Sequence, residues 1–200
     1  SIIAIGASQE DNSGGSGGYA RVYEIISGIW TQIGSDLAAT SSGDRLGGYH
    51  GVSLNSFGDI LALGATRNDA NGSNAGNARV YENISGTWTQ LGSDINGDAV
   101  DDYFGWSVDL DHSGNSLVVS ARGNDGGGSS SGQVKVFENI SGTWTQVGSD
   151  IYGSVGDGIG KSVPFSGDAS TIAFGSSSNG YVQPMRYLSQ TPAGCTNPVA

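Results

Sequence analysis

The sequence predicts an all-β protein, a β-propeller-like array of four-stranded antiparallel blades. A stretch that reads ENISGTWTQLGSD at 82–94 returns as ENISGTWTQVGSD at 138–150 and as EIISGIWTQIGSD at 24–36. Short runs rich in Val, Ile, Tyr, Phe and Trp alternate with Gly, Ser, Asn and Asp, which is typical of strands joined by tight turns. No stretch keeps the 3.6-residue period of a helix.

The repeat period is about 57 residues, because Trp30, Trp88 and Trp144 lie 58 and 56 residues apart. A fixed period of this length indicates a repeat architecture, and the chain holds about 3.5 such repeats. We divide the chain into a β-propeller-like repeat domain, 1–188, and a C-terminal linker that leads into a further module, 189–200. Within the domain we expect a partial blade, two blades and a second partial blade, at 1–36, 48–93, 104–149 and 159–188.

Each period contains four strand-like runs. In one copy they are FGWSVDL at 104–110, SLVVSA at 116–121, QVKVFENI at 133–140 and TWTQVGS at 143–149. Ile-Ser-Gly between the third and fourth runs predicts a tight hairpin in which glycine takes positive φ. The first run is matched in the other copies by GYHGVSL at 48–54 and by IGKSVPF at 159–165.

The repeated Trp and Asp residues have an architectural explanation. An active site is normally built once, whereas packing contacts recur in every repeat. We expect the tryptophans to cover the joints between adjacent blades: Trp30, Trp88 and Trp144. We expect the aspartates to accept backbone N–H bonds in the turn that leaves each blade: Asp36, Asp94 and Asp150.

Composition excludes two classes of partner. The chain has 200 residues, and its 8 Lys and Arg face 19 Asp and Glu, a formal net charge of −11. Such a charge repels phosphate backbones and anionic membranes, so we expect no nucleic-acid binding. No run approaches the roughly 20 apolar residues of a membrane span, so we expect no membrane insertion.

The opening SIIAIGAS lies inside a strand pattern, and we expect the chain to be a piece of a longer precursor.

These residues resemble the FG-GAP repeat, the blade of integrin-alpha-like β-propellers. Phe104-Gly105 with Ser-Val after it, and Gly64-Ala65 or Ser120-Ala121 after the second strand, resemble the two halves of that name. The resemblance covers 1–188. More narrowly, the repeats are similar to the WTQxGSD variant found in large secreted or surface proteins of marine bacteria and algae. The resemblance implies an extracellular or cell-surface location.

The resemblance also makes calcium a candidate cofactor, since integrin-type blades bind it in the first hairpin through a D-x-D-x-D-G loop. Here DLDHSGN offers Asp109 and Asp111, whereas the other copies read LNSFGD and FSGDAS. A hard cation takes about six to eight oxygen ligands, so the sequence departs from the family's pattern. The densest acidic run, INGDAVDDYFG, adds Asp98, Asp101 and Asp102. This run is either a cation or polar-ligand site or a solvated loop.

The tail GCTNPVA, at 194–200, resembles the start of the Gly-Cys-Thr repeats that follow such domains in secreted bacterial proteins. The resemblance implies that the partner of Cys195 lies beyond residue 200. A free terminal thiol is the other interpretation, and the sequence leaves both open.

We expect no enzymatic activity. His50 and His112 do not recur between copies, and neither has a Cys or a second His at metal-ligand spacing. No G-x-S-x-G motif marks a nucleophilic serine.

The sequence favours a non-catalytic module of a large cell-surface or secreted adhesin, which binds a glycan or protein ligand through its blade loops. The alternative is a purely structural module that assembles a surface filament or appendage and takes no small ligand. Non-repeating aromatic and histidine residues are the candidate ligand contacts: Tyr49, His50, Tyr103, Trp106 and Tyr152. Open strand edges invite partner strands, so further modules or copies of the same protein are candidate partners.

Overall fold

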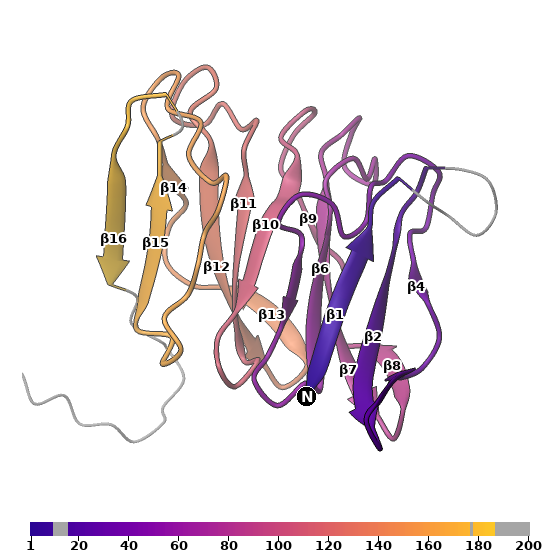
Figure 1. The fold of residues 1–200 in the computed structure, drawn as a ribbon. Helices are drawn as coiled ribbons and strands as arrows, with labels where there is room; N and C mark the ends of the chain where they lie inside the picture. The colour runs from indigo at the N-terminus through magenta and orange to yellow at the C-terminus, as the bar shows by residue number, and fades with distance from the viewer. Residues whose placement is uncertain (10–15, 177, 187–200) are drawn as a thin grey trace, which may run out of the picture.

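The protein is a row of antiparallel β-sheets. The computed structural model describes residues 1–9, 16–176 and 178–186, and the regular elements in these ranges are all β-strands. They form four sheets that stand side by side in an arc (Figure 1). The predicted all-β, propeller-like array is therefore confirmed. In the described ranges no helix is long and apolar enough to cross a membrane. Cys195 and the linker predicted at 189–200 lie outside the described residues.

We number the sheets as blades 1 to 4 in chain order. Blade 1 contains β1 (Ile2–Ala7), β2 (Tyr19–Ile26), β3 (Ile29–Gln32) and β4 (Leu37–Ala38). Blade 2 contains β5 (Val52–Leu54), β6 (Ile60–Ala65), β7 (Asn77–Ile84), β8 (Thr87–Gln90) and β9 (Ile95–Asn96). Blade 3 contains β10 (Phe104–Leu110), β11 (Ser116–Ala121), β12 (Gln133–Ile140), β13 (Thr143–Gln146) and β14 (Ile151–Tyr152). Blade 4 contains β15 (Thr171–Gly175) and β16 (Val182–Arg186).

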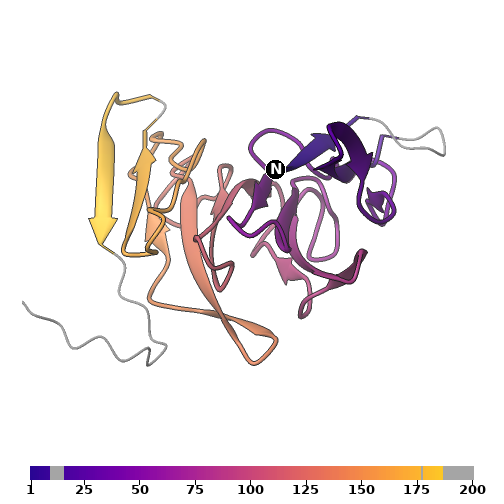
Figure 2. The same cartoon turned by 60° about the horizontal axis from the view of Figure 1, so that its bottom comes forward.

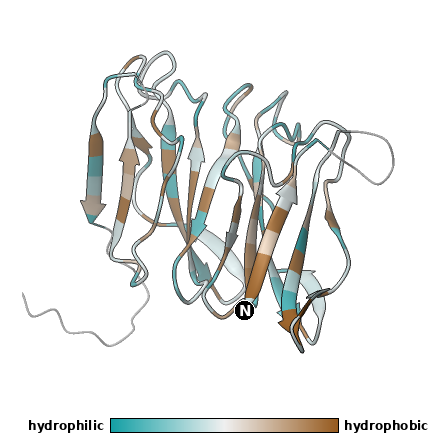
Figure 3. Ribbon diagram, viewed as in Figure 1, coloured by the Kyte–Doolittle hydropathy of each residue, from teal (hydrophilic) through white to brown (hydrophobic). Residues whose placement is uncertain are grey.

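Consecutive strands pair in order within each blade, so blade 3 reads β10-β11-β12-β13. The structure adds one short strand to each of blades 1 to 3 that the sequence did not predict. These strands, β4, β9 and β14, pair with β2, β7 and β12 respectively. Each is two residues long, too short for the alternation that identifies a strand. Brown apolar segments in Figure 3 lie along the strands, and two buried clusters unite apolar residues of adjacent blades.

Glycines allow the blades to approach closely at the inner end of each joint. Gly64 of β6 lies against Gly105 of β10, and a Cβ on Gly64 would lie 2.0 Å from the Gly105 carbonyl oxygen. Gly6 lies against Gly47 in the same way, and a Cβ on Gly6 would lie 2.3 Å from the Gly47 carbonyl oxygen. The Phe-Gly and Gly-Ala parts of the repeat therefore meet across a joint, one from each blade.

The structure corrects the alignment of the first strand in blade 2. The sequence matched 48–54 with the run that begins at Phe104-Gly105, but Leu46 and Gly47 take that place. Both Leu46 and Phe104 pair with the alanine that ends the second strand of their blade. Two extra residues before β5 account for the shift, and they bring Tyr49 to the inner edge of the blade.

The repeated tryptophans close the outer end of two joints. Trp88 Nε1 donates a hydrogen bond to the Ile33 carbonyl of blade 1 at 3.1 Å, and Trp144 Nε1 donates to the Leu91 carbonyl of blade 2 at 3.0 Å. Each indole thus fixes a blade to the one before it. Trp30, the counterpart in blade 1, is 47% exposed.

The repeated aspartates bind side chains. Asp94 accepts hydrogen bonds from Arg79 Nε at 2.9 Å, from Arg79 Nη2 at 2.8 Å and from Gln90 Nε2 at 2.7 Å. Burial opposes ionisation of Asp94, but the bonds from Arg79 and Gln90 outweigh it and lower its pKa. These donors replace the backbone N–H groups that the sequence analysis expected. The other copies pair Asp36 with Arg21 and Gln32, and Asp150 with Gln146 and Lys135.

Candidate functional site

Non-repeating residues of blades 2 and 3 form an aromatic cluster at their inner edges, which we call the inner rim. The rings of Tyr49 and Trp106 are stacked, with centroids 3.7 Å apart and planes inclined by 16°. Tyr103 meets Trp106 edge-on, with centroids 6.5 Å apart. Tyr49 is 53% exposed and Trp106 is half-buried, so Tyr49 is the more open ring of the stack.

The backbone holds the inner rim in a strained but well-supported conformation. Tyr49 and Tyr103 both have φ of 54°, a left-handed region that bulky residues rarely adopt. His50 fixes the segment before β5 against β10, because its N–H donates to the Trp106 carbonyl at 3.2 Å and its carbonyl accepts from Val108 N at 3.0 Å. Strain that neighbouring contacts maintain is a feature of ligand sites.

Two arginines flank the stack. Arg45 Nη1 donates to the Tyr49 hydroxyl at 3.1 Å, and the Arg122 guanidinium lies 5.0 Å from the centroid of the Trp106 ring. The ion pairs of the described residues use Arg21, Arg79 and Lys135 and include neither of these arginines. The inner rim therefore carries positive charge on a chain whose net charge is −11.

An open groove of about 350 Å³ continues from the inner rim along the inner edges of blades 2, 3 and 4. Tyr49 and His50 line one end, and Ser162 contributes from the segment before blade 4. Asp109 lies on its wall and accepts hydrogen bonds from Ser53 Oγ and Phe165 N, both at 2.8 Å. The groove thus offers an aromatic end and a polar wall.

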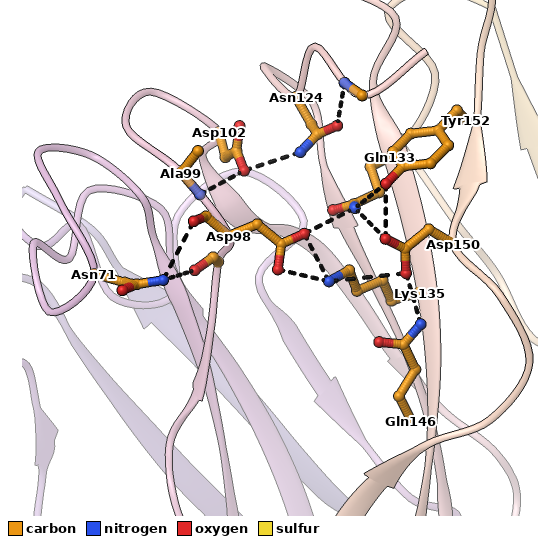
Figure 4. Close-up of polar contacts among 12 residues, drawn as sticks. Asn71, Asp98, Ala99, Asp102, Asn124, Gln133, Lys135, Gln146, Asp150 and Tyr152 are labelled. Carbon is orange, nitrogen blue, oxygen red and sulfur yellow. Dashed lines mark hydrogen bonds and ion pairs between the residues drawn. The ribbon is translucent and has the colours of Figure 1, made fainter.

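The predicted ligand contacts are only partly gathered at this site. Trp106 contacts both Tyr49 and Tyr103, and exposed His50 joins them through its backbone. Tyr152 lies elsewhere, in the polar network of Figure 4, where its hydroxyl donates to Asp150 at 2.8 Å. That bond, together with burial, raises the pKa of Tyr152.

The acidic run between blades 2 and 3 is divided among separate contacts (Figure 4). Asp98 binds Lys135 Nζ at 2.7 Å and Gln133 Nε2 at 3.0 Å. Asp102 is buried and accepts bonds from Asn124 Nδ2 and Ala99 N, both at 2.9 Å; burial outweighs these bonds and raises its pKa. Asp101 is exposed and accepts from Asn74 Nδ2 at 2.8 Å.

The first hairpin of blade 3 is closed by its own carboxylate. Asp111 accepts bonds from Ser113 Oγ at 2.7 Å and from Ser116 N at 2.9 Å, so both its oxygens serve the turn. Within the described ranges, no group of three or more His, Cys, Asp or Glu side chains could hold a metal ion. The two sets of metal candidates in the sequence, Asp109 with Asp111 and Asp98 with Asp101 and Asp102, do not form such a group in the described ranges. Calcium binding stays a prediction.

Sequence reasoning missed the two arginines of the inner rim. Arg45 and Arg122 belong to no repeated motif. Arg45 contacts Tyr49 and Arg122 lies over Trp106, and the two arginines share one site because these two rings stack. A usable signal was the scarcity of cations, since a chain with 8 Lys and Arg places two of them beside one aromatic stack. Charge scarcity alone, however, does not locate a residue in space.

The comparisons with known proteins agree with this architecture. Residues 94–137 match the FG-GAP repeat, so the chain contains FG-GAP-like repeats. No curated protein matches the chain.

Several solved structures share the fold. A putative 6-phosphogluconolactonase from Bacteroides uniformis aligns with 86% of this chain and 45% of its own, with TM-score 0.59 and 12% identity. Kuenenia stuttgartiensis hydrazine synthase aligns with 93% and 55%, with TM-score 0.58 and 13% identity. The periplasmic gluconolactonase of Pseudomonas aeruginosa aligns with 94% and 50%, with TM-score 0.58 and 19% identity. This chain therefore spans about half the length of the structures it matches.

These likenesses correct the expectation that the chain is not an enzyme. The two lactonases named above share this fold, so the propeller architecture gives no ground for excluding hydrolytic activity. At 12–19% identity they show the fold alone and transfer no reaction.

Proposed function

We propose that this chain is a ligand-binding propeller module of an extracellular or cell-surface protein, and that the inner rim binds a glycan. The observation that carries the proposal is the Tyr49–Trp106 stack, in which the more open ring is backed by a second ring at 3.7 Å. An exposed aromatic ring held in this way presents a flat apolar face of fixed orientation, on which the apolar face of a sugar ring stacks.

The arginines define the class of glycan. Guanidinium groups donate several hydrogen bonds in a planar fork and bind carboxylates with two bonds at once. Arg45 and Arg122 flank the stack and take no part in the ion pairs of the described residues. Sugars that carry a carboxylate or sulfate group are therefore the preferred ligands, because they gain charge-assisted bonds that neutral sugars lack.

The location follows from the type of repeat rather than from the inner rim. FG-GAP-like repeats are typical of extracellular and surface proteins, and the match at 94–137 supports that setting. A surface protein meets acidic glycans on neighbouring cells and in the matrix, so the proposed ligand and the proposed location are consistent.

A panel of neutral, carboxylated and sulfated glycans tests the proposal, with titration of the chain and of Tyr49→Ala. We expect binding of acidic members and a loss of about tenfold or more in affinity, at least about 1.4 kcal/mol, in Tyr49→Ala. Phe57→Ala is the matched control, because Phe57 is also an exposed ring, at 64%, but lies in the β5–β6 hairpin away from the inner rim.

Two results would contradict the proposal. One is that no glycan binds; the other is that Tyr49→Ala and Phe57→Ala bind equally well. Running the panel in calcium and in EDTA separates the candidate sites. Loss of binding in EDTA would point to the acidic residues instead of the aromatic stack.

A further inference from the structure

The face of each blade that meets the preceding blade is built from the same positions. In blades 2 and 3 the second strand contributes two aliphatic residues that are 0% exposed: Leu61 and Leu63, and Leu117 and Val119. In blade 1 the same two positions are Ile3 and Ile5, which are 39% and 52% exposed. Together with Trp30 they form an apolar surface, which we call the leading face.

The opposite end of the arc carries the complementary type of surface, on blade 4. In blades 1 to 3, the third strand's face toward the next blade is buried: Ala20 and Val22, Ala78 and Val80, and Val134 and Val136. In blade 4 the pairing of β15 with β16 places Val182 and Pro184 at these positions. Val182 is 77% exposed and borders an open groove of about 340 Å³ with Pro164, Ala173 and Lys161. We call this surface the trailing face.

We propose that the leading face of one copy of this chain binds the trailing face of a second copy, head to tail. The joints between blades 1 and 2 and between blades 2 and 3 supply the template, because each unites one face of each type. Ile3 and Ile5 would then rest on Val182 and Pro184 of the second copy, as Leu61 and Leu63 rest on Ala20 and Val22 within the chain. Contact between two leading faces has no counterpart in the structure.

Two further observations favour a second copy as the occupant. The chain spans 45–55% of the solved structures that share its fold, so two copies match their length. The four sheets in the described part of each copy give eight, within the usual range of about four to eight blades in a closed propeller. Figure 2 shows blades 1 and 4 at opposite ends of the arc, as a head-to-tail ring requires.

Charge is also compatible with this contact. The acids of a chain with net charge −11 repel a second copy over most of the surface. The residues named above for the two faces are apolar apart from Lys161. Arg21, which lies opposite Ile5 and therefore on the leading face, is paired with Asp36. The faces therefore meet where that repulsion is weakest. Added salt screens the remaining repulsion, and association should therefore strengthen with ionic strength.

Sedimentation velocity of the full chain, at protein concentrations up to about 100 μM, tests the proposal. We expect a dimer that becomes monomeric in Ile5→Lys and also in Val182→Lys. Both positions are exposed, so the variants should keep the melting temperature of the parent monomer. Val155→Lys is the matched control, because Val155 is 67% exposed but belongs to neither face, and it should remain dimeric.

Mixing the two monomeric variants makes the test specific for head-to-tail contact. Ile5→Lys retains an intact trailing face and Val182→Lys an intact leading face, so an equimolar mixture should form a heterodimer through one joint. A monomeric parent chain would overturn the proposal. So would a dimer that Ile5→Lys breaks and Val182→Lys leaves intact, because that pattern indicates contact between two leading faces.

Discussion

The repeated hairpin of blade 2 and that of blade 1 have nearly the same sequence and very different environments. Trp88 is 9% exposed and Trp30 is 47% exposed. The side chain of Arg79 is 5% exposed and that of Arg21 is 32% exposed. The difference arises because blade 1 covers blade 2, whereas nothing in the described chain covers blade 1. In a repeat protein the same residue therefore contributes differently according to its neighbour.

Replacing the two tryptophans should give the largest contrast. Trp88→Ala removes a buried indole and its hydrogen bond to Ile33, and we expect a loss of about 3–5 kcal/mol in the free energy of unfolding. Trp30→Ala should cost less than about 1 kcal/mol in the monomer. Urea unfolding at low protein concentration measures both. Equal losses would show that the Trp88 joint contributes little to stability.

Replacing the two arginines should give a smaller contrast. Arg79→Met leaves the partly buried carboxylate of Asp94 without its cation, and we expect a loss of about 2 kcal/mol. Arg21→Met breaks a more exposed pair and should cost less than about 1 kcal/mol. The same urea titrations compare them. A larger loss for Arg21→Met would contradict burial as the cause.

The glycine after the fourth strand also tests whether a neighbouring blade decides the cost of a substitution. Gly92 and Gly148 have φ of 81° and 75°, so alanine is strained equally at both. A Cβ on Gly92 would also lie 2.8 Å from the Gly142 carbonyl oxygen and 3.1 Å from Trp144, whereas a Cβ on Gly148 would meet nothing within 4 Å. Gly92→Ala should therefore cost about 1–2 kcal/mol more than Gly148→Ala in thermal unfolding. Equal losses for the two variants would mean that the Trp144 side chain and the Gly142 backbone move aside at little cost in free energy.

The contrast between copies explains how much the sequence could predict. Strand-forming runs and hairpin glycines are local signals, so the blades and their order were predictable. The environment of Trp30 or Trp88 depends on which sheet stands beside it, and no local pattern records that. The strands β4, β9 and β14 were missed because two residues are too few to show the alternation of apolar and polar residues that identifies a strand.

The inner rim was predictable only as a set of residue types. Non-repeating aromatics indicated a site, and Trp106 does contact both Tyr49 and Tyr103. The two extra residues after Gly47 decide this geometry. Alignment of the copies missed them, because it matched Gly48 rather than Leu46 with Phe104. Arg45 and Arg122 lie outside the repeated pattern, so only the three-dimensional arrangement of blades 2 and 3 brings them to the stack. Sequence differences between the repeats thus indicated where the site lies, and the three-dimensional structure shows which residues come together there.

Acid should reduce the free energy of unfolding that Arg79→Met costs, and so its difference from Arg21→Met. This is the smallest effect that we expect. The pKa of Asp94 is below its ordinary value of 3.8, so the folded state binds its proton less readily than the unfolded state. Its contribution to stability is complete above about pH 5 and is lost as the pH falls through 3.8 toward the lower folded value. Protonated Asp94 no longer needs Arg79, so Arg79→Met should cost about 1 kcal/mol less at pH 3 than at pH 7. Urea titrations of the parent and Arg79→Met at both pH values measure the change. A cost that is independent of pH would assign the role of Arg79 to packing of its aliphatic stem rather than to its charge.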